Sequence, residues 1–120
     1  MTATLGILVR SDPYDRRGGR ERLDPVLAAA SLEIPLKIFF VGDGVLHLVP
    51  RQQPGDLPAS PYTRAWAALS ELSEQVELFA ESAALKQVSG WSGELIVEVR
   101  ECDKKSIARE LNECGAVIHV

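Results

Sequence analysis

The segment of residues 36–50, LKIFFVGDGVLHLVP, constrains the fold of this chain more than any other. It begins with a short apolar run at residues 38–41, IFFV, which is rich in β-branched and aromatic side chains. Such a run is typical of a strand that is buried on both faces of a parallel sheet. Binding sites in open α/β sheets form beyond the carboxyl ends of the strands. We therefore expect the Gly42-Asp43-Gly44 turn to lie at a functional site or at a subunit-contact surface.

The rest of the chain predicts strands that alternate with helices. Residues 4–9 form an apolar run, and residues 20–31 carry apolar side chains at the spacing of a helix with one buried face. With the run at 38–41 they predict a βαβ unit with a right-handed crossover. We expect further strands at 74–80, 94–100 and 116–120, and further helices at 61–72, at 82–88 with Ser82 as its cap, and after the cap residue Asp103, ending at Gly115.

This alternation predicts the α/β class: a three-layer α/β/α sandwich around a mainly parallel five-stranded sheet. A chain of 120 residues fits a single domain, residues 1–120. The net charge of −4 argues against a nucleic-acid binder, which usually has a basic face. No apolar run approaches the ~20 residues of a membrane span. The first residues lack the basic region of a signal peptide, so we expect a cytoplasmic protein.

Few residues form a pattern that carries chemistry. The loop at 10–21 contains Arg16, Arg17 and Arg20 and could bind an anion, but it matches no phosphate-binding motif. Asp43 could act as a base or a metal ligand, although no second ligand is near it in sequence. Its simpler role is to satisfy backbone N–H groups of the following turn. The sequence therefore predicts no bound cofactor or metal.

The histidines and cysteines are also weak signals. His47 and His119 lack partners at metal-ligand spacing, so we expect packing or surface roles. Cys102 precedes the Asp103 cap and lies near two lysines, which partly fits a reactive thiol. Cys114 lies on the apolar stripe of the last helix and should be buried and inert. On this basis Cys102 is the one candidate nucleophile.

Three segments resemble one protein family over most of the chain. The first is P…GRExLD at residues 13–24, which leads into a helix rich in alanine. The second is FFVxDGVxxLVPxQ at residues 39–52, and the third is the last helix and strand, ending with residues 112–120. These segments resemble the DsrE/DsrF/DsrH-like sulfur-relay family, and within it the TusC/DsrF branch.

The resemblance implies a small α/β/α domain that is one subunit of a heterohexamer. Its partners would be TusB/DsrH-like and TusD/DsrE-like subunits. The complex would take persulfide sulfur from a TusA-like donor and pass it to a TusE-like acceptor, toward 2-thiolation of wobble uridine in tRNA. The family's relay cysteine follows the third strand of the TusD/DsrE-like subunit, and the matching place here is near Ala80, where no cysteine stands.

The leading hypothesis is therefore a non-catalytic subunit without a cofactor of its own and without direct contact to nucleic acid or membrane. It predicts a large apolar surface that partners cover. An alternative is a DsrF-like subunit in dissimilatory sulfur oxidation. A rival is a sulfurtransferase that acts through Cys102, and a third class is a nucleotide-binding module that uses the arginine loop. The residues expected to contact a partner or to have a structural role are Asp43, Gly44, Val45, Leu48, Tyr62 and Trp66.

Overall fold

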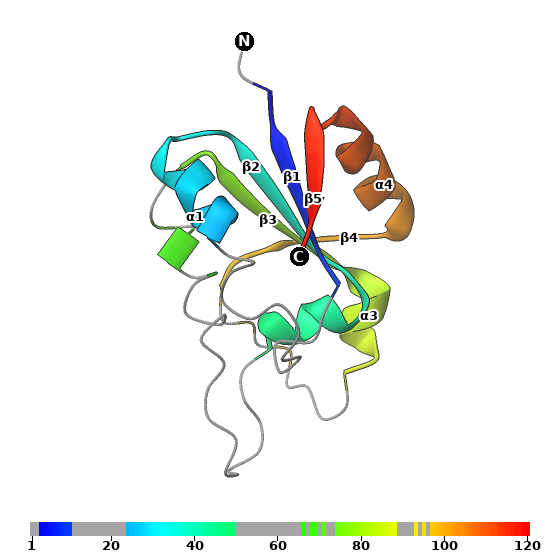
Figure 1. Ribbon diagram of the computed structural model, residues 1–120. Coiled ribbons are helices and arrows are strands. Elements are labelled where there is room, and N and C mark those ends of the chain that lie inside the picture. Colours follow the sequence, from blue (N-terminus) through cyan, green and yellow to red (C-terminus); the bar gives the residue numbers. More distant parts are fainter. Residues whose placement is uncertain are drawn as a thin grey trace.

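The computed structural model describes residues 3–10, 24–49, 66, 68–69, 71, 74–88, 93, 95 and 97–120. Its centre is a five-stranded sheet in the order β4-β3-β2-β1-β5 (Figure 1). All four pairings are parallel, which confirms the predicted α/β fold. The strands are β1 (Leu5–Val9), β2 (Leu36–Phe40), β3 (Val76–Glu81), β4 (Arg100–Cys102) and β5 (Ala116–His119).

Helices lie on both faces of this sheet and at one of its ends. Helix α1 (Asp24–Ser31) covers one face and helix α4 (Lys104–Glu113) covers the other (Figure 1). The 3-10 helix η2 (Gly42–His47) and helix α3 (Ser82–Lys86) follow β2 and β3, at the end where these strands finish. Among the described residues, no helix combines the length and the hydropathy needed to cross a membrane.

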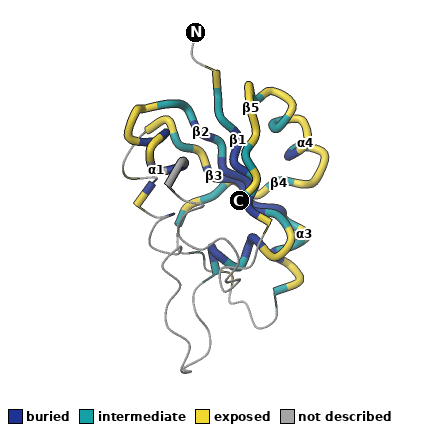
Figure 2. The backbone as a smooth tube through the Cα atoms, in the orientation of Figure 1, coloured by how far each residue is buried: buried dark blue, intermediate teal, exposed yellow. Residues whose placement is uncertain are grey.

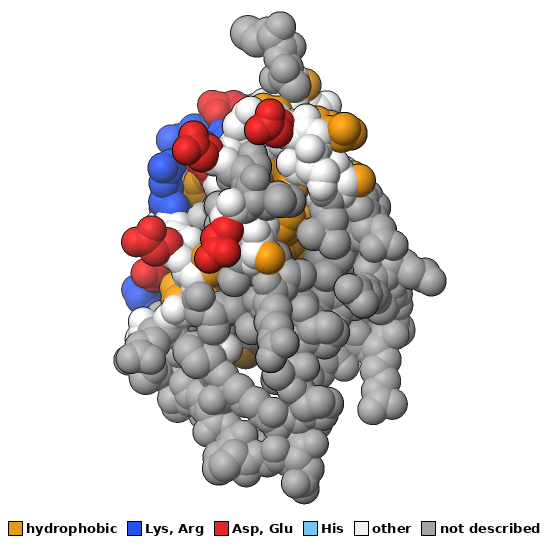
Figure 3. Space-filling model, turned by 90° about the vertical axis from the view of Figure 1, so that its left-hand side faces the viewer, with side chains coloured by type: hydrophobic (Ala, Val, Ile, Leu, Met, Phe, Trp, Pro, Cys, Tyr) orange, Lys and Arg blue, Asp and Glu red, His pale blue; other side chains and the backbone are white. Residues whose placement is uncertain are grey.

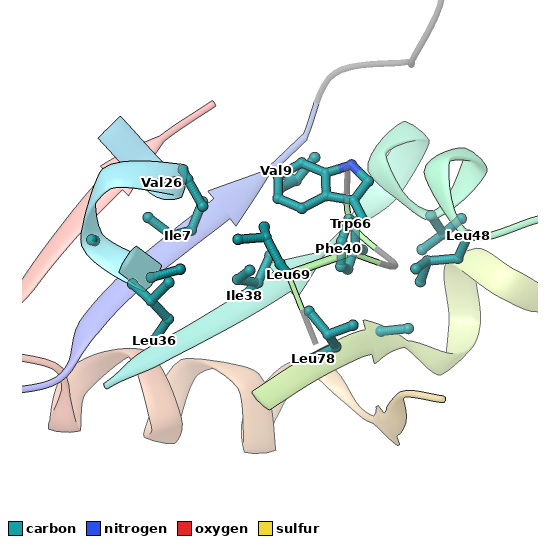
Figure 4. Packing of buried hydrophobic residues seen from close by; sticks show 14 of the residues in the cluster. Ile7, Val9, Val26, Leu36, Ile38, Phe40, Leu48, Trp66, Leu69 and Leu78 are labelled. Atoms are coloured by element: carbon teal, nitrogen blue, oxygen red, sulfur yellow. The ribbon is translucent and has the colours of Figure 1, made fainter. Parts of the chain in front are cut away.

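The α1 face of the sheet carries the larger hydrophobic core. Alternate residues of a strand point to the same face, so every second side chain of β1, β2 and β3 packs here. Trp66 and Leu69 pack on them from the side of α1, and Figure 4 shows the Trp66 indole beside Phe40. Burying each large side chain contributes about 1.5–3 kcal/mol. The buried strand residues are Ile7, Val9, Leu36, Ile38, Phe40, Leu78 and Ala80.

The α4 face of the sheet has a smaller core. It consists of Phe39, Phe79 and Ile107, with partly buried side chains such as Leu8 and Leu111 around them. The two phenylalanine rings stack with their centroids 4.8 Å apart. Asp103 caps α4 by accepting a 2.8 Å hydrogen bond from the Ser106 N–H, as predicted. Figure 2 shows that α4 keeps much of its surface exposed, whereas the central strands are buried.

The predicted position of the fourth strand, residues 94–100, is wrong. Strand β4 begins at Arg100, whose Cα lies opposite Phe79. Upstream of it, Leu95, Val97 and Val99 pack half-buried against the α1-face core without belonging to a strand. Their alternation correctly indicates one apolar face, but a buried face does not require ladder hydrogen bonds with β3.

One expected helix cap is also wrong. Ser82 is the first residue of α3 rather than its cap, because the cap residue is Glu81. Helix α4 ends at Glu113 with Cys114 as its C-cap, so Gly115 follows the end of this helix as expected, although its φ is not positive. A Cβ at Gly115 would lie 2.7 Å from the Ala3 Cβ, so glycine is needed here for close packing.

Candidate functional site

The candidate site lies at the carboxyl ends of β2 and β3. Gly42 leaves β2 with φ +52°, a left-handed conformation that suits glycine, and the chain then turns into η2. Gly44 donates its N–H to the Val41 carbonyl at 2.8 Å. A Cβ at Gly44 would lie 2.0 Å from the Val9 carbonyl oxygen. This glycine therefore allows η2 to pack directly against the end of β1.

Glu81, the last residue of β3, reaches across to this turn. Phe40 and Ala80 are register partners, so the residues that follow them lie side by side. One carboxylate oxygen of Glu81 accepts a hydrogen bond from the Gly42 N–H at 3.2 Å. The Glu81 residue is 7% exposed, and it is one of two buried polar residues in the described chain. An acid in this position ties the end of β3 to the beginning of η2.

A pocket of about 580 Å³ opens between η2 and α3. Its apolar lining comes from both helices and from the turn after α3, and its polar lining from four residues of different elements. Glu81 is the buried member of the polar group, whereas Asp43 and Lys104 are exposed. The apolar residues are Val45, Leu46, Ala83, Ala84 and Val88, and the polar residues are Asp43, Glu81, Gln87 and Lys104.

Three of the residues expected to contact a partner are core residues. Val45 is 2% exposed, and Leu48 and Trp66 are fully buried within the chain. The Trp66 Nε1–H donates a 3.0 Å hydrogen bond to Nδ1 of His47, which is buried too. Leu48 and Trp66 therefore have a structural role in the core, and Val45, although nearly buried, also lines the pocket. The expectation that His47 is a packing or surface residue is confirmed as packing.

The other sequence candidates have different positions. Asp43 is exposed in the first turn of η2. The N-cap residue of η2 is Val41, and this end of the helix has no capping hydrogen bond from a side chain. The expectation that Asp43 satisfies the N–H groups of the turn is wrong, because the Glu81 carboxylate does so at Gly42. Gly44 is buried. Tyr62, Arg16, Arg17 and Arg20 lie outside the described residues.

The sequence matches known proteins over nearly its full length. The profile of the DsrE/DsrF-like family matches residues 3–120. The chain belongs to the DsrE/DsrF-like family. It is 42% identical over 118 residues to the protein named TusC of Klebsiella pneumoniae subsp. pneumoniae, and the match covers 95% of this chain and 96% of that relative. A TusC homolog of Aliivibrio fischeri is 32% identical over 114 residues, with the same coverage.

A solved structure shares the fold of this DsrE/DsrF-like chain. The crystal structure of the ychN protein from E. coli superposes with a TM-score of 0.66, and the match covers 100% of both chains. Its sequence is 16% identical to this chain, so this likeness concerns the fold. The family resemblance seen in the sequence motifs is thus confirmed by the profile and by relatives named TusC, and the five-stranded fold by the ychN structure.

The two thiols of this DsrE/DsrF-like chain lie away from the pocket lining. Cys102 ends β4 and packs partly buried against the α4-face core, and Cys114 follows α4. Burial raises the pKa of the Cys102 thiol, despite the nearby Arg100, and burial likewise raises the pKa of Cys114. A raised pKa lowers the fraction of reactive thiolate at neutral pH. Cys114, the C-cap of α4, packs against the same small core as Ile107 and Leu111, but it is half-buried rather than fully buried as expected.

The described residues also show no set of side chains that fits a metal. Among them, no three histidine, cysteine or acidic side chains come together closely enough to hold an ion. Glu81, Gln87 and Lys104 are the site residues that the sequence interpretation missed. The signal for Glu81 is an acid at the end of an apolar strand, and it becomes informative once β2 and β3 are known to be parallel neighbours.

Proposed function

We propose that this chain is a non-catalytic, TusC-like subunit of a cytoplasmic sulfur-relay complex that passes persulfide sulfur toward 2-thiolation of tRNA wobble uridine. Its partners would be a TusB/DsrH-like and a TusD/DsrE-like subunit, in a heterohexamer. A TusA-like donor and a TusE-like acceptor would meet the complex at the partner that carries the relay cysteine. Membership of the DsrE/DsrF-like family and relatives named TusC support this proposal.

The observation that carries the non-catalytic part is the chemistry at the end of β3. The family resemblance puts the place of the relay cysteine near Ala80, and Ala80 is fully buried and followed by Glu81. A persulfide forms on a thiolate, and neither a methyl group nor a carboxylate can carry it. The raised pKa values of Cys102 and Cys114 also disfavour a substitute nucleophile elsewhere in the described chain.

Co-expression tests the assembly. When this chain is produced with a TusD-like and a TusB-like chain from the same organism, we expect one complex that contains all three, measured by light scattering after size-exclusion chromatography. If this chain elutes separately from a stable complex of the other two, the subunit proposal is wrong.

Mass spectrometry tests the role of the thiols. After incubation of the complex with a persulfide donor, we expect the ~32 Da mass increase of persulfidation on the TusD-like partner. Sulfur transfer should be unchanged in a Cys102→Ser variant and in the matched Cys114→Ser variant. Loss of both the adduct and the transfer activity in Cys102→Ser alone would favour a sulfurtransferase that acts through this residue.

A further inference from the structure

We propose that the pocket between η2 and α3 binds a cationic side chain, lysine or arginine, of a partner protein, with Glu81 as its counter-charge. The identity of the partner as a subunit of the relay complex depends on the proposed function, but the chemistry of the pocket does not.

The Glu81 carboxylate is buried but incompletely satisfied. An ionised carboxylate offers about four hydrogen-bonding positions. The structure gives Glu81 one hydrogen bond, from the Gly42 N–H. None of the described lysines and arginines forms an ion pair with it, although Lys104 also lines the pocket. A buried charge is unfavourable unless it is paired, so this carboxylate is best completed by a cation from outside the described chain.

The bond to Gly42 also fixes how the carboxylate can bind a ligand. It holds one oxygen toward the backbone of η2 and leaves the second oxygen for a donor in the pocket. No described side-chain oxygen is both fully enclosed and without a hydrogen-bond partner, so the second oxygen keeps some access to the pocket. The fold therefore orients the Glu81 carboxylate as a hydrogen-bond acceptor before any ligand binds.

The lining of the pocket matches the shape of a lysine or arginine side chain. Val45, Ala83, Ala84 and Val88 provide an apolar wall, and the two alanines leave room for an incoming chain. Lysine and arginine bury their methylene stems along apolar surface while the charged head reaches a polar group. A small hydrophilic cation would gain nothing from this wall.

The described surface of the chain carries few large hydrophobic side chains. Among the described residues, Leu32 and Val117 are the exposed large hydrophobic side chains, so the large apolar surface expected from the sequence is absent from this part of the chain. Figure 3 views another face, the left-hand side of Figure 1, and its described part carries acidic and basic side chains with hydrophobic ones between them. A buried ionic anchor can supply specificity on such a surface.

An NMR titration of the full chain tests the chemistry of the pocket. N-acetyl-arginine amide and N-acetyl-lysine amide should shift the amide signals of Gly42, Ala83 and Ala84, and the neutral isostere N-acetyl-citrulline amide should bind about tenfold more weakly. Glu81→Gln keeps an oxygen acceptor for Gly42 and removes the charge, so it should weaken binding of the cations about tenfold. Equal binding of the arginine and citrulline probes would overturn the proposal.

Two further variants separate binding from folding. Glu77→Gln is the same substitution on the same strand at an exposed position outside the pocket, and it should change the affinity less than about twofold. Ala83→Leu fills the pocket from an exposed helix position and leaves the Glu81 side chain itself unchanged, and it should abolish the shifts. If Ala83→Leu folds and binds the arginine probe like the wild type, the pocket is not the binding site.

The partner is tested on the co-expressed complex. Glu81→Gln should raise the dissociation constant of this chain for the complex about tenfold, whereas Glu77→Gln should leave it within twofold. If the arginine probe binds but Glu81→Gln assembles normally, the pocket takes a free cation and the partner assignment is wrong. If the wild-type chain forms no complex, the proposed function fails, and the probe titration still decides the chemistry of the pocket.

Discussion

The two faces of the sheet are built differently. The α1 face packs apolar side chains and aromatic rings, and its described polar contact inside the core is the hydrogen bond from Trp66 to His47. The α4 face has three buried side chains, and beside them an ion pair between Lys37 of β2 and Glu110 of α4, with an N–O distance of 2.5 Å. The same central strands supply both faces by alternation of their side chains.

This difference indicates which face of the sheet contributes more to the stability of the fold. Stability from apolar burial grows with the area removed from water, so the α1 face should carry most of it. The ion pair on the α4 face involves side chains that are 22% and 28% exposed, and such pairs contribute little. Substitutions on the two faces should therefore differ in their effect on stability.

The largest effect is expected for Trp66→Ala on the α1 face. The change removes a fully buried indole that packs edge-on against Phe40, and it leaves His47 without its indole donor. We expect a loss of about 3–5 kcal/mol in the free energy of unfolding, measured by urea denaturation. Trp66→Phe, which keeps an aromatic ring, should lose about 1–3 kcal/mol. A loss below 1 kcal/mol for Trp66→Ala would contradict the importance of this face.

A smaller effect is expected for Phe79→Leu on the α4 face. The variant loses the stacking of the Phe79 ring on Phe39. It also loses the cation–π contact with Arg100, whose guanidinium carbon lies 5.5 Å from the centroid of the Phe79 ring. We expect a loss of about 1–2 kcal/mol in the same denaturation experiment. Arg100→Gln serves as the control and should cost less than ~1 kcal/mol, because the guanidinium is exposed. If Phe79→Leu were as costly as Trp66→Ala, the two faces would contribute equally.

The smallest effect is expected for Lys37→Met, which removes the ion pair and keeps the apolar stem. We expect a change below ~1 kcal/mol at pH 7. The hydrogen bond to Glu110 raises the pKa of Lys37 above its usual 10.5, although burial opposes this shift. The stabilisation is therefore complete below about pH 10.5 and is lost as the pH rises through the higher pKa of the folded state. Denaturation curves at pH 8 and pH 11 should show a smaller difference between wild type and variant at pH 11.

The sequence predicts the sheet better than the site. Strands β1 and β2 agree with the expected runs within two residues, because strands buried on both faces are continuously apolar. Glu81 could not be identified in this way, since its contact with Gly42 depends on a register between strands far apart in the sequence. Trp66 was expected at an interface because large aromatic residues favour both cores and interfaces, and residue type does not distinguish the two.

The strand order also has a consequence for how the chain folds. Strand β5 pairs with β1, in a register that places Leu5 opposite Ala116, so this ladder closes a loop of more than a hundred residues. Closing a long loop costs entropy before any contact can repay it, and nonlocal parallel pairings form slowly. During synthesis, β1 therefore remains an open edge until the last strand leaves the ribosome. We expect the amide of Val120, which bonds to the Leu8 carbonyl, to gain protection from hydrogen exchange late in refolding.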